Sequence, residues 1–106
     1  MTGSADLSVA RSVVDELIRL AALEVPGVVR VDRSSPRWLT ALLGGRSVVA
    51  RLDGRRVNAR LAIVARPGHP LVPLTRQVRQ AVSAAIERLV DLEAGEIVIV
   101  VDGVGS

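Results

Sequence analysis

The spacing of apolar residues predicts a helix near the beginning of the chain. From Ser8 to Val25 apolar side chains recur at helical spacing, and polar side chains fall on the opposite face. Pro26 disfavours helical geometry at Val25, and Gly27 permits a sharp exit, so the helix should end there. The expected core-facing positions of this helix are Ala10, Val13, Val14, Leu17, Ile18 and Ala21.

Alternating apolar and polar residues predict a short strand at 28–32 and then a hairpin. Residues 47–53 and 56–66 flank an Asp-Gly pair, which is the strongest short-range hairpin signal. Pairing across this turn places the apolar residues of both strands on one face and leaves a more polar, wet face opposite. The apolar face holds Val48, Ala50, Leu52, Val57, Ala59 and Leu61, and the polar face holds Val49, Arg51, Asn58 and Arg60.

A second long helix and a last strand complete the pattern. Helical spacing returns over residues 71–92, with apolar positions at Leu71, Leu74, Val78, Val82, Ala85 and Leu89. Residues 97–101 are apolar at every position, which is typical of a central strand. A strand, helix and strand in succession favour a last strand parallel to its predecessor, if both lie in one sheet.

The stretch RPGHPLVPLTRQVRQ, residues 66–80, resembles a phosphate site at first sight because glycine and arginines precede a helix. A phosphate cradle needs several backbone N–H donors, and Pro67, Pro70 and Pro73 have none. We therefore interpret the stretch as a stiff joint between a strand and a helix, with Pro73 in the first helical turn.

Together these elements predict an α+β fold with two layers. We expect a small mixed sheet of about four strands with both long helices on one face. The order along the chain is helix, strand, short helix, strand, strand, helix, strand. Residues 1–7 are expected to be a disordered lead, and residues 8–104 a single domain.

Residues 33–46 have their own helix signals and leave two interpretations open. Ser35 can cap a short helix, Pro36 suits its first position, and two glycines at 44–45 end it. Four apolar residues would share one side of this helix: Trp38, Leu39, Leu42 and Leu43. They either cover an edge of the sheet or present an apolar patch to a partner or a membrane surface.

Composition argues against catalysis and against a bound cofactor or metal. The 106 residues contain no cysteine, no tyrosine and a single histidine, His69. That histidine lies between glycine and proline, where a solvated turn residue is the usual interpretation. Few acid, base or nucleophile arrangements, and no cysteine-based metal site, can be built from this set. We therefore expect a protein that is not an enzyme and that has no cofactor, metal or small-molecule substrate.

The charge balance leaves a nucleic-acid function as an alternative. All 14 basic residues are arginine, and 11 carboxylates reduce the formal net charge to +3. The exposed face of the hairpin would carry Arg51, Arg56 and Arg60, which could bind phosphate without reading sequence. The chain has no GxxG loop and no aromatic platform for stacking bases, so nucleic-acid binding is the less favoured interpretation. Direct attachment to anionic lipid is a third possibility.

The segment ELIRLAALEVPGVVRV, residues 16–31, resembles the alkaline shock protein family of bacterial envelope stress response proteins. The helix-ending motif of that family is matched here by Ala21, Ala22, Glu24, Gly27 and Val28. The resemblance continues in order through VARPG, a long helix with Leu74, Val78 and Val82, and the closing strand IVIVVDGV. It covers residues 8–104, and it departs from the family at Arg79, where a glutamine is usual.

The resemblance implies a non-enzymatic cytoplasmic protein at the inner face of the cell membrane. Members of the family act in envelope homeostasis, are held there by a small membrane-anchored partner, and associate with each other as homo-oligomers or with related members. No catalytic residues come with the resemblance. The candidate partner-binding residues are Trp38, Leu39, Leu42 and Leu43, together with Arg76, Arg79 and Gln80 on the polar face of the second long helix.

Overall fold

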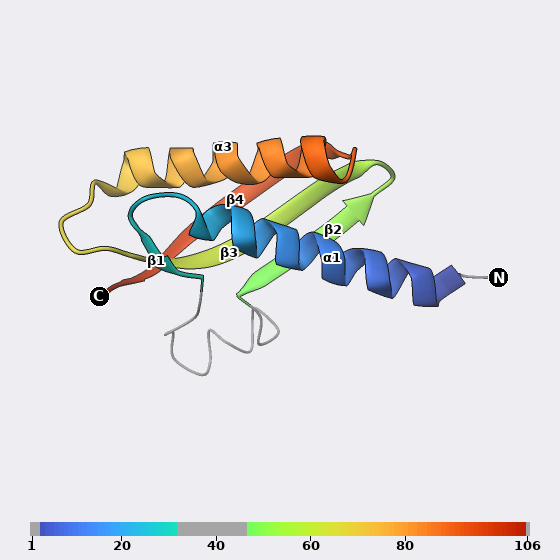
Figure 1. The fold of residues 1–106 in the computed structure, drawn as a ribbon, viewed down its shortest axis with the longest axis horizontal. Coiled ribbons are helices and arrows are strands. Elements are labelled where there is room, and N and C mark those ends of the chain that lie inside the picture. The colour runs from blue at the N-terminus through green and yellow to red at the C-terminus, as the bar shows by residue number, and fades with distance from the viewer. Residues whose placement is uncertain (1–2, 32–46, 106) are drawn as a thin grey trace.

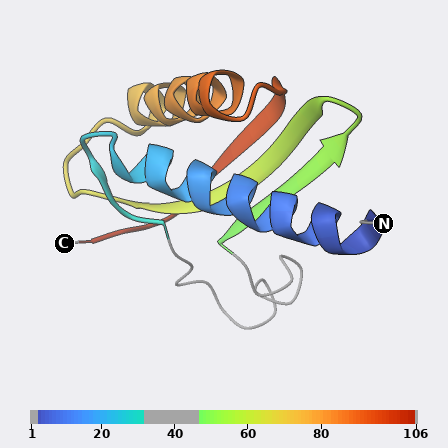
Figure 2. The same ribbon diagram turned by 45° about the vertical axis from the view of Figure 1, so that its right-hand side comes forward.

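The structure is a computed structural model that describes residues 3–31 and 47–105. It contains two long helices and four strands, and both helices lie on one face of the sheet (Figure 1 and Figure 2). In chain order they are α1 (Gly3–Leu23), β1 (Val28–Arg30), β2 (Val48–Asp53), β3 (Arg56–Ala65), α3 (Leu71–Leu89) and β4 (Glu93–Val104). The predicted two-layer α+β architecture with a mixed sheet is therefore confirmed. The predicted short helix at 33–46 lies outside the described residues.

Strand β3 is the centre of the sheet. It pairs antiparallel with β2 along its first half, antiparallel with β1 at its end, and parallel with β4 along its length. The N–H of Ala62 donates to the Ser47 carbonyl and the N–H of Arg66 donates to the Gly27 carbonyl. Because successive peptide groups of a strand point to alternate edges, these bonds put β1 and β2 on the same edge of β3. On the other edge of β3, the one described strand is β4.

The hairpin is confirmed residue by residue. Strands β2 and β3 are joined by the two-residue turn Gly54-Arg55, and Gly54 has the positive φ of 62° that such tight turns require. The predicted register holds, with Val48 opposite Leu61, Ala50 opposite Ala59 and Leu52 opposite Val57. The apolar face of this hairpin packs under the helices, and the face with Arg51 and Arg60 points away from them.

The prediction that the last strand is central is wrong. Among the described strands β4 pairs only with β3, so it is an edge strand of 12 residues. Its alternate residues Ile97, Ile99 and Val101 pack against the core under the helices. Val98 and Val100 lie on the other face of the sheet, outside that core. A strand that is apolar on both faces thus stands at an edge, where one of its two hydrogen-bonding sides has no described strand.

Two bulges limit the regular part of β4. Near its start, residues 95–96 lie opposite the single residue Asn58, and near its end Asp102 is an extra residue between two consecutive pairs. At the first bulge the Asn58 amide oxygen accepts the N–H of Glu96 at 2.8 Å. Gly95 is needed there, because a Cβ at that position would collide with the Asn58 side chain. Only residues 97–101 therefore form an unbroken ladder with β3.

The core is aliphatic and lies between the helices and the sheet. On α1 it contains Val14, Ile18, Ala21 and Ala22, and on α3 it contains Leu74, Val78, Val82 and Ile86. No charged or polar residue is buried in the described part of the chain. Each fully buried aliphatic side chain contributes about 1.5–3 kcal/mol relative to an exposed one, so this cluster supplies most of the stability.

The predicted helices differ from the observed ones at their ends and at the edges of their buried faces. Val13 was expected to face the core and is 54% exposed, because it lies about 100° around α1 from buried Val14. Leu71 and Leu89 were also expected in the core and are exposed, because they are the first and last residues of α3 and lie beyond its buried row. Helix α1 begins at Gly3 rather than at Ser8.

The joint between β3 and α3 packs against the exit of α1. The imidazole of His69 lies directly on Gly27, so that a Cβ at Gly27 would stand only 2.6 Å from its Nε2 atom. Gly27 also has a φ of 99°, a conformation that residues with a side chain rarely adopt. Its carbonyl accepts the N–H of Arg66 at 2.8 Å. His69, which the sequence suggested was a solvated turn residue, is therefore a half-buried packing residue.

We expect Gly27→Ala to destabilise the fold more than Gly54→Ala. Both substitutions force a residue with a Cβ into positive φ, which costs about 1–3 kcal/mol. Only the alanine at position 27 also meets a side chain, because Gly54 has open space around it. Chemical denaturation of both variants measures the difference. The double variant Gly27→Ala/His69→Ala should recover part of the loss, and equal losses for the two single variants would contradict the proposed packing.

Candidate interaction surfaces

The outer edge of β4 is the first candidate surface. Since Ala62 turns its peptide group toward β2, its neighbour Leu61 turns toward β4 and bonds to the residues on either side of Ile99. The peptide groups of Ile97, Ile99 and Val101 therefore point outward from the sheet. The Nε–H of Arg79 on α3 donates to the Ile97 carbonyl at 3.0 Å, which agrees with this assignment.

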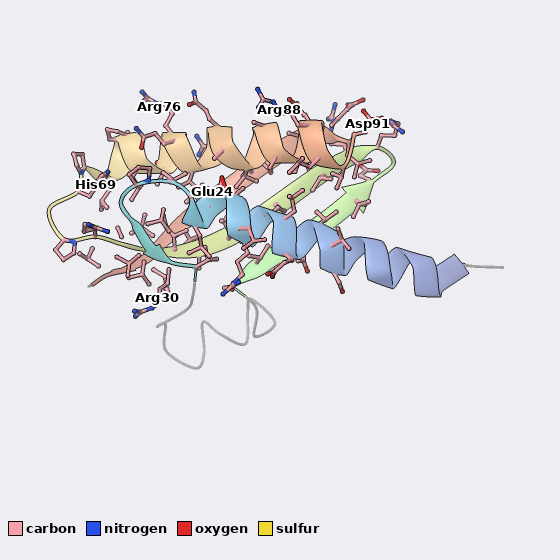
Figure 3. All side chains as sticks on the ribbon, viewed as in Figure 1. Glu24, Arg30, His69, Arg76, Arg88 and Asp91 are labelled. Carbon is pink, nitrogen blue, oxygen red and sulfur yellow. The ribbon has the colours of Figure 1, made fainter. Side chains whose placement is uncertain are left out.

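Arg79 therefore has a different role from its neighbours on α3. Its side chain reaches down to the edge of β4, while Arg76 and Gln80 are exposed on the helix. Figure 3 shows Arg76 and Arg88 projecting away from the sheet. The three residues predicted as one polar surface are thus divided between the sheet edge and the solvent-facing side of α3. The other predicted partner-binding residues, Trp38, Leu39, Leu42 and Leu43, lie outside the described residues.

Exposed apolar side chains form further candidate surfaces that the sequence pattern did not identify. On α1, Val13 and Leu20 are about half exposed and lie two turns apart on the same flank. On α3, Val72 is 68% exposed and lies two turns before Arg79. Because a spacing of seven residues repeats the same flank of a helix, Val72 lies on the flank of α3 from which Arg79 reaches the β4 edge. The spacing places Val13 among the core-facing residues and does not single out Leu20 or Val72.

The hairpin arginines are partly neutralised by the segment that leads into β4. Arg56 lies 3.8 Å from a Glu93 carboxylate oxygen, and Arg55 lies 3.6 Å from a carboxylate oxygen of Asp91 and donates to its backbone carbonyl. These pairs are exposed, so each contributes little to stability. They do remove net positive charge from the turn. Arg51 and Arg60 remain, diagonally opposed on the face of the sheet that is turned away from the helices.

The described residues contain no group of three or more His, Cys, Asp or Glu side chains placed to hold a metal ion. Neither described helix carries the long apolar stretch that crossing a bilayer requires.

In the family-like motif at the end of α1, the two alanines, Gly27 and Val28 each have a structural explanation. Ala21 and Ala22 are buried and small, which lets α1 approach the layer beneath it closely. Gly27 supplies the positive φ and the space for His69. Val28 is buried at the start of β1. Glu24 is exposed at the helix exit. The motif therefore shapes a turn and does not assemble reactive groups.

The whole chain matches one protein family. The model of the alkaline shock protein 23 family, whose function is described as cell envelope-related, matches residues 2–106. This match confirms the resemblance that the motif at residues 16–31 indicated. No curated protein matches the chain.

Solved structures with a similar fold include variant forms of the C-terminal domain of MamM. One is 22% identical in sequence with a TM-score of 0.56, and the match covers 87% of this chain and 95% of that one. A second is 21% identical with a TM-score of 0.55 over the same share of each chain. A third, described as a nickel form, is also 21% identical, with a TM-score of 0.56 and 96% of that chain covered. At this level of identity the likeness shows a shared fold.

We expect the hairpin arginines to contribute neither to stability nor to nucleic-acid binding. Arg51 and Arg60 have no partner in the part of the chain that the structure describes, so Arg51→Ala/Arg60→Ala should change the free energy of unfolding by at most about 0.5 kcal/mol. Titration of the wild-type chain with single-stranded and double-stranded DNA at low and high salt measures binding. Salt-sensitive binding that disappears in the double variant would establish the nucleic-acid alternative.

Proposed function

Because the chain belongs to the alkaline shock protein 23 family, whose function is cell envelope-related, we propose that it is a non-enzymatic scaffold for envelope homeostasis. In this proposal the protein lies in the cytoplasm at the inner face of the cell membrane. A small membrane-anchored protein holds it there, and copies of the chain or related family members associate with it. The observation that carries the proposal is the family match over residues 2–106.

The character of the described surface supports an interaction function. The largest exposed apolar side chains lie on the outer flanks of the two helices and at the sheet edge, where a partner can reach them. The aliphatic core stabilises the fold. In this proposal the functional contacts are made by exposed side chains.

We place the contact with the anchored partner on the helix side of the molecule. Arg76 and Gln80 are exposed there on α3, and Val13 and Leu20 add apolar area on α1. Interfaces combine an apolar centre with a polar rim in which arginine is enriched, and this surface offers both. The apolar side of the 33–46 segment, centred on Trp38, belongs to the same proposal as the predicted anchor of the interface.

Sedimentation of the purified protein with three kinds of vesicle tests the anchored partner. These are inside-out native membrane vesicles, the same vesicles digested with protease, and protein-free vesicles of anionic lipid. We expect binding to the untreated native vesicles only, because the receptor is a protein. Equal binding to the digested vesicles or to pure lipid would contradict a protein anchor and would favour direct attachment to lipid.

Substitutions locate the contact in the same assay. Trp38→Ala and the pair Arg76→Ala/Gln80→Ala should each weaken binding to native vesicles by about tenfold, as expected for residues at the centre of an interface. Arg88→Ala on the same helix is the matched control, since it removes an exposed arginine without touching the proposed surface. An equal loss in the control variant would attribute the effect to charge alone.

A further inference from the structure

The outer edge of β4 can accept one more strand. Because β4 is apolar at residues 97–101, an apolar partner strand suits it best. The edge offers the outward peptide groups of Ile97, Ile99 and Val101, and of these only the Ile97 carbonyl has a described partner, Arg79. An apolar edge strand is a template for pairing with another chain, and residues 98–101 are half-buried in the single chain. Here the strand is also apolar on its second face, through Val98 and Val100, as strands in the interior of a sheet are.

We propose that β4 pairs antiparallel with β4 of a second copy of this chain, centred on Ile99. The pairing rests on the self-association included in the proposed function and adds the surface and the register. A two-fold pair is self-complementary, because each copy offers the same outward groups to the other. Centring on Ile99 uses the whole unbroken segment, with Ile97 opposite Val101 of the other copy and Val98 opposite Val100.

The bulges limit the length of the pair, and the two-fold axis closes it. Residues 95–96 and Asp102 interrupt the ladder at both ends of the segment 97–101, so a partner strand has a short regular site with defined limits. Strand pairing across a two-fold axis uses this edge on both copies and leaves no free β4. The assembly at this edge is therefore a dimer.

The symmetry of the segment favours a second copy as the occupant. The regular ladder of 97–101 has the same length on both copies, so centring on Ile99 pairs every regular residue of each strand. Glu96 and Asp102 lie at the two bulges, outside this ladder. Arg79 uses one lone pair of the Ile97 carbonyl, and the second lone pair can accept the incoming N–H.

The flank of α3 above the edge completes the contact. Val72 lies on the same flank of α3 two turns before Arg79, and it is 68% exposed in the single chain. A second copy related by a two-fold axis brings its own α3 alongside, so that the exposed Val72 side chains are covered from both sides. This accounts for a large exposed apolar residue that the core of one chain does not use.

Engineered cysteines test the register directly, because the chain has no cysteine of its own. Chains carrying Val98→Cys are mixed with chains carrying Val100→Cys and oxidised, without any membrane or partner. Opposed residues of a non-hydrogen-bonded antiparallel pair lie about 4.5 Å apart at Cα, which suits a disulfide. We expect cross-linked dimers from the mixture and far fewer from either variant alone. Val49→Cys on β2, at the opposite edge, is the control and should not cross-link.

A charge reversal tests the role of Arg79. Arg79→Glu should raise the dissociation constant of the dimer by roughly tenfold or more in sedimentation velocity, because it replaces the donor to the Ile97 carbonyl with a carboxylate at the edge where the partner strand pairs. Arg79→Lys should restore most of the affinity, and Arg88→Glu, the same charge change on the opposite flank of α3, should leave it unchanged. Denaturation curves confirm that each variant is folded.

Two results would overturn the β4 pair: mixed cysteine variants that cross-link no better than each variant alone, or Arg79→Glu chains that dimerise as the wild type does. Failure of the pair is distinguishable from failure of the proposed function. Normal vesicle binding without cross-linking would remove the β4 pair alone, and cross-linking without vesicle binding would remove the anchored partner alone.

Discussion

Strand β3 is hydrogen-bonded along both edges, and the position of every other described element follows from it. One edge carries β2 and then β1 in succession, so the two antiparallel partners share a single line of peptide groups. The other edge carries β4 in parallel, which requires a crossover, and α3 supplies it. Helix α1 leads directly into β1 and lies over the same face that α3 covers (Figure 1). The aliphatic core fills the space between the helices and this face.

The arginine content has a different meaning in the structure from the one that composition suggests. Arg55 and Arg56 lie beside Asp91 and Glu93, which precede or begin β4. Arg79 bonds to a backbone carbonyl at the edge of the sheet. These three arginines of the described chain thus make different contacts in different places. A contiguous phosphate-binding face would need them gathered on one surface, facing the same ligand.

The elements and their local geometry could be predicted from the amino-acid sequence. Helical and alternating spacing located both helices and the hairpin, and Asp53-Gly54 set the register in which Ala50 faces Ala59. Helix spacing, strand alternation and turn type depend on residues only a few positions apart. Such short-range preferences can therefore be recognised in a single amino-acid sequence. The family could be recognised for the same reason, because its motif is a local turn around Gly27.

The place of β4 and the roles of His69 and Arg79 emerged only from the packed molecule. Apolar residues on both faces of a strand indicate burial, but they do not distinguish burial inside one chain from burial against another. His69 contacts Gly27 and Arg79 bonds to Ile97, and these partners are far apart in the sequence. No periodicity records such contacts, since they arise only when the helices and the sheet have packed together. The outer edge of β4 therefore became a candidate site only once the order of the strands was known.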